Sequence, residues 1–287
     1  DVVQTISAGG ETDKNNWGEA WIYARESWIA RLNYDYRDKY LLEAIFRRDG
    51  SLKFPPDSRW GNFPGLLLGW RASEEDFWKE NLGFINYFKL RASYGKIGMD
   101  PGNPFQYLNK YTKTSGLTLG TSKTVESVVK REGVANPNIT WEKQTTYNIG
   151  FDSQFLNNLF SLDVDLFYNK RSDILAKRSA SVPEFTGLTL PDENIAEVDN
   201  RGVEFTAGYH KIINNDFRFD ISGNFSYNHN KVVFMDEPER AVPWQQRTGH
   251  PYGAEILYKA IGIFADEEAV NSYPHWDGAK PGDVIFE

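Results

Sequence analysis

The side chains that most often perform catalysis or bind metals are sparse in this sequence of 287 residues. Cysteine is absent, which excludes disulfide scaffolds, thiolate-ligated zinc, iron–sulfur clusters and thiol catalysis. The histidines are scattered and follow neither HExxH nor any paired metal-ligand spacing; they are His210, His229, His250 and His275. We therefore expect no catalytic residue, no metal site and no cofactor. His210, on an expected strand, is better explained as a residue of a lumen wall or an interface.

Two other patterns resemble parts of known sites without completing one. Asp163 and Asp165 point the same way in an extended strand, as paired carboxylates in acid–base catalysis do, but a polar sheet face produces the same arrangement. We favour the sheet face. Glycine and lysine combine in Gly95-Lys96-Ile97-Gly98 and between Gly116 and Thr124, yet neither segment has P-loop or GxGxxG spacing. We interpret these two segments as a strand end and a loop.

Aromatic side chains in expected long loops are the candidates for substrate contact: Trp244, Trp141 and Tyr252. Aromatic faces stack on sugar rings and on peptide side chains. Packing at the base of a loop is the alternative, and we favour it for Trp141 and for Trp60. Trp244 is the stronger candidate because it lies in the polar sequence Pro243-Trp244-Gln245-Gln246-Arg247.

The elements that position these residues have a period of two. Phe217, Phe219 and Ile221 alternate with Arg218 and Asp220, whereas an amphipathic helix needs apolar residues at i, i+3, i+4 and i+7. The same alternation predicts eight strands, within 28–36, 40–49, 63–73, 87–97, 143–154, 160–173, 201–211 and 217–232. A weaker ninth strand is predicted over 256–264.

Short and long connections alternate along the chain. Tight turns are expected at 37–39, 156–159 and 212–216, and long loops at 51–62, 98–142, 174–200 and 233–255. The link 74–86 is intermediate, and its beginning predicts a helical turn. In an up-and-down sheet this alternation places every long loop at one end, which is the asymmetry of outer-membrane barrels.

Three features favour a barrel in lipid over a soluble sheet. The strands reach the ~9–11 residues that cross a bilayer, against ~5–6 in soluble sheets. Tyrosines gather at strand ends, as in an interfacial girdle, and charged residues occupy mid-strand positions of the other face, as in a wet lumen. The tyrosines are Tyr34, Tyr36, Tyr40, Tyr168, Tyr209 and Tyr227, and the charged residues Glu43, Lys89, Arg91, Asp163, Asp165, Glu204, Arg218 and Asp220.

Composition narrows the classes of protein to which the chain could belong. Aromatic residues make up 15% of the chain, which excludes a disordered protein, and no segment approaches the ~20 apolar residues of a membrane helix. The net charge of −8 argues against a nucleic-acid partner. A soluble β-sandwich carbohydrate-binding module is the main alternative, because one solvated sheet face alternates identically. An outer-membrane β-barrel enzyme is a third, disfavoured by the lack of a nucleophile and base.

Several sequence segments, taken in order, resemble one family. They are Arg31-Leu32-Asn33-Tyr34-Asp35-Tyr36, Phe46-Arg47-Arg48-Asp49-Gly50-Ser51, Arg59-Trp60-Gly61-Asn62-Phe63-Pro64, Gly69-Trp70-Arg71-Ala72-Ser73-Glu74-Glu75, Lys89-Leu90-Arg91-Ala92-Ser93-Tyr94-Gly95, Pro137-Asn138-Ile139-Thr140-Trp141-Glu142-Lys143, Tyr147-Asn148-Ile149-Gly150, Asn200-Arg201-Gly202-Val203-Glu204, Phe225-Ser226-Tyr227-Asn228 and Pro281-Gly282-Asp283. The set resembles the barrel of SusC-like (RagA-like) TonB-dependent outer-membrane transporters of Bacteroidetes, over residues 28 to 287.

The resemblance implies that residues 1–287 form part of a TonB-dependent receptor barrel, with 8–9 strands of about 22. It also implies a bacterial outer-membrane location, a SusD-like surface lipoprotein as partner, lipid around the wall, and energy from the TonB complex through a plug domain. The imported substrate would be an oligosaccharide or a peptide. No plug is recognised in these residues. Pro281-Gly282-Asp283 resembles the start of an acidic loop near the C-terminal end of family members, and no cation site is assigned up to Glu287.

Overall fold

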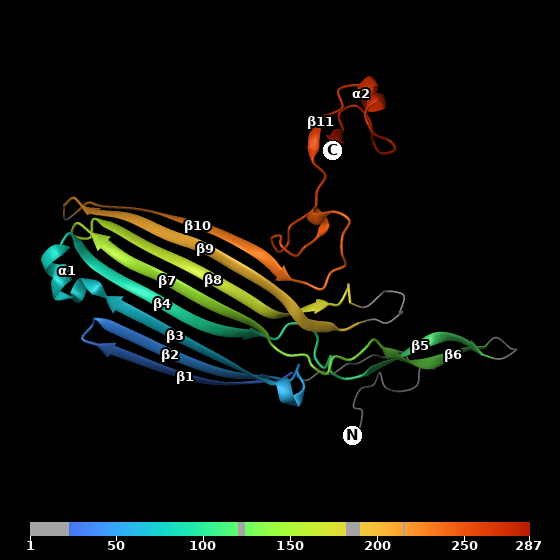
Figure 1. The fold of residues 1–287 in the computed structure, drawn as a ribbon, viewed down its shortest axis with the longest axis horizontal. Helices are drawn as coiled ribbons and strands as arrows, with labels where there is room; N and C mark the ends of the chain where they lie inside the picture. Colours follow the sequence, from blue (N-terminus) through green and yellow to red (C-terminus); the bar gives the residue numbers. More distant parts are fainter. Residues whose placement is uncertain (1–22, 120–123, 182–189, 215) are drawn as a thin grey trace.

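The computed structural model describes residues 23–119, 124–181, 190–214 and 216–287. Its main feature is a curved sheet of eight antiparallel strands in which sequential strands are neighbours (Figure 1). The strands are β1 (Arg25–Tyr36), β2 (Tyr40–Ser51), β3 (Trp60–Arg71), β4 (Ile85–Met99), β7 (Glu142–Phe155), β8 (Phe160–Lys177), β9 (Asp192–Ile212) and β10 (Arg218–Phe234). The sheet is open, with β1 and β10 at its two edges.

Two smaller sheets lie beyond one end of the main sheet (Figure 1). One is the hairpin of β5 (Lys110–Leu119) and β6 (Thr124–Glu132), and the other pairs β11 (Ala260–Ile263) with β12 (Val284–Phe286). The helices are short: α1 (Asp76–Asn81) follows β3, and α2 (Glu267–Ser272) follows β11. In the described ranges, no helix has the length and apolar character to cross a membrane.

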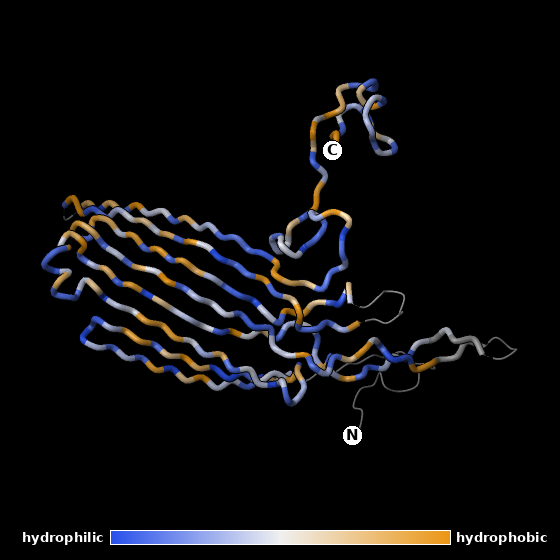
Figure 2. The backbone as a smooth tube through the Cα atoms, viewed as in Figure 1, coloured by the Kyte–Doolittle hydropathy of each residue, from blue (hydrophilic) through white to orange (hydrophobic). Residues whose placement is uncertain are grey.

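Strand pairing places most apolar strand positions on one side of the main sheet. Phe151 lies opposite Val164, which lies opposite Phe205, so apolar residues continue from strand to strand. We call this side the apolar face; it carries Leu32, Leu42, Leu66, Leu68, Leu90, Ile149, Phe151, Val164, Leu166, Val203, Phe205, Ile221 and Phe225. Figure 2 shows the resulting alternation of hydrophobic and hydrophilic residues along the strands.

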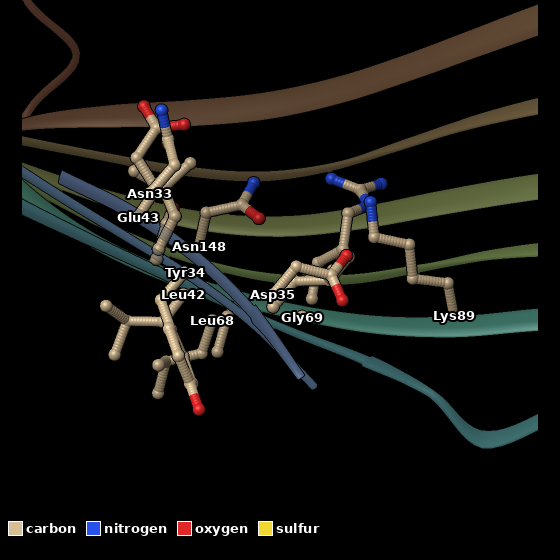
Figure 3. Close-up of a pocket in the computed structure, with 14 residues that line it drawn as sticks. Asn33, Tyr34, Asp35, Leu42, Glu43, Leu68, Gly69, Lys89 and Asn148 are labelled. Carbon is tan, nitrogen blue, oxygen red and sulfur yellow. The ribbon is translucent and has the colours of Figure 1, made fainter. Parts of the chain in front are cut away.

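The other side is the polar face, and a close view of β1 to β4 separates the two. Asn33 and Glu43 point to one side of the strands, and Tyr34 and Leu42 point to the other (Figure 3). Leu166 is 51% exposed on the apolar face, and many of its apolar neighbours are similarly exposed. Among the described residues no second protein layer covers this face, unlike the inner face of a soluble β-sandwich.

The two ends of the sheet differ as the connection lengths predict. At one end, hereafter the short-turn end, β1 and β2 are joined through Arg37 and Asp38, whose φ values of 56° and 55° are those of the two-residue turns that match strand twist. Leu156, Asn157 and Asn158 make the β7–β8 turn, also with positive φ. The expected turn at 212–216 includes Asn215, which lies outside the described residues. The opposite end is hereafter the long-loop end.

The link between β3 and β4 closes the short-turn end with a cap around Glu75. The carboxylate accepts hydrogen bonds from the Tyr40 hydroxyl at 2.7 Å, the Lys39 ammonium at 2.9 Å and the Trp70 indole at 3.3 Å. These bonds, from Tyr40 above all, lower the pKa of Glu75 from 4.5 to about 2. The predicted helical turn follows as α1, whose Trp78 ring stacks on Phe88 with centroids 4.8 Å apart.

A compact core lies at the long-loop end, where the β2–β3 and β4–β7 connections meet. Phe54, Phe63, Ile139 and Trp141 are each at most 5% exposed and form one cluster. The Trp141 ring contacts Phe54 and Phe63 at centroid distances of 5.2 and 5.5 Å. A side chain on Gly98 would meet the Phe63 ring at 2.0 Å, so glycine leaves the space that this ring fills.

The eight predicted strands and the helical turn are confirmed, and three expectations are corrected. The predicted loop 98–142 contains the β5–β6 hairpin, although part of the segment Gly116 to Thr124 lies outside the described residues. The predicted loop 174–200 is shorter, because β9 begins at Asp192 rather than near 201. The ninth strand, predicted over 256–264, is wrong as a member of the sheet: only Ala260–Ile263 is a strand, and it pairs with β12.

Candidate functional site

The polar face is held together by a guanidinium that spans three strands. Arg91 on β4 lies opposite Gly150 on β7, which lies opposite Asp165 on β8. The Arg91 side chain reaches across Gly150 and donates two parallel hydrogen bonds of 3.0 Å to Asp165. Its Nε donates to Asp152 at 2.9 Å. A forked Arg–carboxylate pair fixes geometry as well as charge, so three strands are tied across the polar face.

The contact between Arg91 and Asp165 requires glycine at position 150. A Cβ built on Gly150 would lie 2.5 Å from the Asp165 Oδ1 atom and 2.5 Å from the Val164 carbonyl oxygen. Gly202 leaves similar space, because a Cβ there would lie 2.6 Å from the ring of Phe167. Phe167 is the apolar residue that breaks the alternation of β8, and its ring fills the space over this glycine. Glycines on this wall thus leave room for neighbouring side chains.

A hollow of about 420 Å³ lies where β1 to β4 run together (Figure 3). It is lined by Asn33, Glu43, Lys89 and Asn148 on the polar face and by Tyr34, Leu42 and Leu68 on the apolar face. Glu43 accepts a hydrogen bond of 2.6 Å from Arg31 across the strand pair. Charged groups of both signs, Glu43 and Lys89, lie on its polar-face side, which suits a wall exposed to water.

A second polar cluster lies near the short-turn end. His210 Nδ1 is 2.8 Å from Asp220, and its Nε2 is 3.2 Å from the Ser161 hydroxyl. Asp220 also accepts a hydrogen bond of 2.7 Å from Arg218. Serine, histidine and aspartate are the residue types of a nucleophilic triad. All three lie on an exposed polar sheet face, and Arg218 binds the same carboxylate. We therefore interpret the cluster as part of the polar wall rather than as a catalytic site.

A pocket of about 740 Å³ at the long-loop end contains two of the three predicted substrate contacts. Trp244 and Tyr252 both line it, and their side chains are 63% and 64% exposed. Gln245, Gln246, Arg247, His250 and Glu255 add polar groups, and Val232, Met235, Ile256 and Leu257 add apolar ones. Aromatic faces beside a few polar groups are typical of ligand pockets.

Backbone pairing with β10 fixes this pocket in place. The Val232 N–H donates to the His250 carbonyl at 2.9 Å, and the Tyr252 N–H donates to the Asn230 side chain at 2.6 Å. Glu237 accepts from the backbone N–H groups of Arg247 and Thr248 at 2.8 and 2.7 Å. Burial opposes ionisation of this carboxyl, but the two donors outweigh it and lower the pKa of Glu237.

A neighbouring carboxylate joins the pocket loop to the β8–β9 connection. Asp236 accepts from the Ser181 hydroxyl at 2.7 Å and from the backbone N–H groups of Ala180 and Ser181 at 3.3 Å. The Ser181 hydroxyl, followed by these N–H groups, lowers the pKa of Asp236 against the effect of burial. The two long connections are therefore held together where they leave the sheet.

The third predicted contact, Trp141, lies elsewhere. Its ring is 5% exposed within the core at the long-loop end, and its indole N–H donates to the Arg59 carbonyl at 3.2 Å. Trp60 is also engaged by protein, since the Arg48 guanidinium lies 5.1 Å from its ring centroid. Trp141 and Trp60 occupy the base of the long connections, where the favoured packing alternative placed them.

Sequence reasoning missed several residues that organise this end of the sheet. Asp100 is 6% exposed and accepts hydrogen bonds from Arg25 and from the Ser51 hydroxyl, the latter at 2.7 Å. The Asn194 side chain accepts from the Thr140 N–H at 2.9 Å and donates to the Thr140 carbonyl at 2.9 Å. Partners so far apart in sequence leave no local spacing signal. In the part of the chain that the structure describes, no group of three or more His, Asp or Glu side chains gathers as metal ligands.

The fold and the two faces define a class of protein, and comparison with known families agrees. A family model described as "TonB dependent receptor-like, beta-barrel" matches residues 3–255. The chain belongs to this family, whose proteins lie in the bacterial outer membrane. Its relatives include a SusC protein, and its fold is similar to that of the RagAB structures.

Individual relatives are TonB-dependent receptors. The chain is 34% identical to the TonB-dependent receptor P39 of Formosa agariphila over 94% of this chain and 25% of that protein. It is 30% identical to the TonB-dependent receptor SusC of Bacteroides thetaiotaomicron over 91% of this chain and 26% of that protein. The chain thus spans about a quarter of the length of these relatives.

Solved structures share the fold. The RagAB peptide transporter aligns with a TM-score of 0.69 and 21% identity, over 85% of this chain and 27% of that chain. The RagAB peptide importer in its open-open state aligns with a TM-score of 0.70 and 20% identity, over 85% of this chain and 26% of that chain.

Proposed function

We propose that the chain contributes eight neighbouring strands to the closed barrel of a TonB-dependent importer, and that this wall performs no catalysis. The observation that carries the proposal is the pairing of two unlike faces on the same strands. The apolar face is exposed over all eight strands, while the polar face carries cross-strand ion pairs such as Arg91 with Asp165. Only a closed barrel pairs every backbone group in hydrocarbon while enclosing a polar lumen.

The substrate proposed is an oligosaccharide or an oligopeptide nutrient. SusC and the RagAB peptide transporter are other proteins, and relatedness to them supports import as the activity rather than a particular cargo. In the pocket at the long-loop end, Trp244 and Tyr252 offer faces to sugar rings or to peptide side chains. Trp141 is left out of the proposed contacts because its ring is buried.

The partners proposed are a SusD-like surface lipoprotein and the TonB complex, the latter acting through a plug domain. Relatedness to SusC and likeness to RagAB support this pairing. The long connections support it in a second way, because Asp236 ties the β8–β9 connection to the pocket loop. A surface lipoprotein needs outer loops that are held in place to dock on.

The test uses the full-length transporter with its lipoprotein, in outer membranes and in detergent. Trp244→Ala combined with Tyr252→Ala should lower binding of a labelled oligosaccharide or oligopeptide about thirtyfold, because each stacked ring contributes roughly 1 kcal/mol. Barrel folding should not change. Trp276→Ala is the matched control, since Trp276 is 45% exposed and lies outside the pocket lining. Unchanged binding and uptake in the double variant would contradict the pocket assignment.

A further inference from the structure

The apolar face ends at the long-loop side in a row of tyrosines. Tyr94 lies opposite Tyr147, which lies opposite Tyr168, and their rings are in contact at centroid distances of 5.4 and 6.3 Å. On β10, Tyr227 lies opposite Val203, two register positions nearer the short-turn end than Arg201, and is 60% exposed. We call these four tyrosines the tyrosine row. Tyrosines in such positions mark the boundary between hydrocarbon and head groups.

The depth of this row matches one side of a membrane. On β8 the apolar positions run from Phe160 at the short-turn end to Tyr168, and on β10 from Phe219 to Tyr227. Each span holds roughly nine residues, the length that crosses the hydrocarbon when strands are tilted. The next positions toward the long loops therefore lie at the level of lipid head groups in the outer leaflet.

Cations occupy this level. Lys96 and Lys170 both lie opposite Thr145, and Lys170 and Lys231 both lie opposite Asp199. Lys96 and Lys170 each follow a tyrosine of the row by two positions, so they share its face. Arg201 lies opposite Tyr168 in the tyrosine row itself. We call these four cations the basic band; they are Lys96, Lys170, Arg201 and Lys231, and all are exposed.

Most of the basic band has no partner within the described part of the chain. Lys170 pairs with Glu197 at 3.1 Å. Asp199, the other acid at this level, accepts a hydrogen bond of 2.6 Å from the Tyr168 hydroxyl. Lys96, Arg201 and Lys231 form no ion pair with any described residue. At the short-turn end the cations Lys39 and Lys79 are paired with Glu75 and Glu74 instead, although Lys211 has no ion pair with a described residue there.

We propose that the basic band binds the phosphate groups of anionic lipids in the outer leaflet. Ammonium and guanidinium groups are strong phosphate ligands, and at this depth a lipid's acyl chains lie along the apolar face while its head group meets the band. Tyr147 and Tyr227, which are 50% and 60% exposed, add hydroxyl donors at the same boundary. The ligand is thus a phosphorylated lipid, held by charge complementarity at one leaflet.

The test compares two triple variants of the full-length transporter purified from its own outer membrane. Lys96→Gln, Arg201→Gln and Lys231→Gln remove the unpaired cations, and Lys79→Gln, Lys211→Gln and Lys259→Gln remove the same charge elsewhere. Native mass spectrometry counts the phosphorylated lipids that remain bound after detergent exchange. The band variant should retain roughly tenfold less lipid or lower still, and the control should retain as much as the wild type. Equal retention in all three proteins, or equal loss in both variants, would overturn the proposal.

A second measurement separates lipid from free phosphate. The wild-type transporter in nanodiscs that mix an anionic with a zwitterionic phospholipid should hold the anionic lipid preferentially, and the band variant should lose that preference. Millimolar inorganic phosphate should leave the bound lipid in place. Complete displacement by inorganic phosphate would overturn the lipid assignment and leave a phosphate site without lipid specificity. Transport of nutrient is not part of either readout, so failure here leaves the proposed function separately testable.

Discussion

The two faces of the main sheet are built from the same strands, yet they are specified in different ways. On the apolar face, Leu166 and its neighbours need only be hydrophobic, because lipid adapts to their shapes. On the polar face, Arg91 reaches Asp165 only because the residue between them is glycine. One face is therefore specified by solvent and the other by individual contacts. The comparison predicts that charge is the damaging change on the first face and size on the second.

The largest effect is expected from a charge on the apolar face. Leu166→Arg should destabilise the barrel by about 2–4 kcal/mol if the arginine lies near mid-bilayer. Thr206→Arg is the matched control, because Thr206 is exposed on the polar face opposite Asp163. Asp165→Arg is a poorer control, since Asp165 binds Arg91. Heat-modifiable mobility and urea unfolding of the full-length protein measure both variants, and equal damage from Leu166→Arg and Thr206→Arg would refute the face assignment.

A single methyl group on the polar face should have the next largest effect. Gly150→Ala places a Cβ 2.5 Å from both Asp165 and the Val164 backbone oxygen, so something must shift. We expect a loss of about 1–3 kcal/mol, as for an overpacked site. Gly95→Ala should cost much less, because a Cβ there meets nothing within 4 Å. Urea unfolding of the two variants makes the comparison, which fails if both lose the same stability.

Removing the spanning guanidinium should cost less than the methyl group. Arg91→Met leaves Asp152 and Asp165 without their cation, but all three side chains are about 30% exposed and water partly replaces the contact. We expect a loss of about 1 kcal/mol. In a double-mutant cycle with Asp165→Asn, the two losses should not add, because each removes the same contact. Additive losses would show that Arg91 and Asp165 act independently.

The smallest effect concerns pH at the short-turn cap, outside both faces. Glu75 has a folded pKa of about 2 against an ordinary value of 4.5, so its ionised form stabilises the folded state. This contribution is fully present above pH 4.5 and is lost as pH falls toward 2. The melting temperature of the wild type should therefore exceed that of Glu75→Gln by a constant amount from pH 8 to about 5. The difference should shrink below that, and a difference that persists at pH 2 would contradict the assignment.

The fold was largely predictable because alternation is a local signal. A strand such as β8 shows in its own residues which side meets lipid and which meets water, and pairing in a meander follows from the short turns. The end of β9 toward the long loops was missed since its first residues, from Asp192, do not alternate. The β5–β6 hairpin was missed for a related reason, because Lys110, Thr112 and Thr114 show no apolar row.

The candidate site was predictable only in part. Trp244 and Tyr252 are predicted contacts because they are aromatic residues of a long loop, and the structure places both in one pocket. Trp141 is also a tryptophan in a long connection, like Trp244. Its ring is nevertheless enclosed by Phe54 and Phe63, which come from distant segments. The contact of Arg91 with Asp165 also depends on residues far apart in sequence. Such long-range contacts are decided by strand register, which single residues do not reveal.

The unequal strand lengths have a further consequence. β1, β2 and β3 have 12 residues each, whereas β8 has 18 and β9 has 21. Counted from the paired row that contains Trp70, Val164 and Phe205, β3 extends 10 residues toward the long loops and β8 and β9 extend 13, which is about 10 Å farther at ~3.3 Å per residue. The outer rim of this wall is therefore slanted rather than level. A solute that arrives from outside therefore meets the strand ends of β8 and β9 before those of β1 to β3, so the two sides of this wall do not offer the same approach.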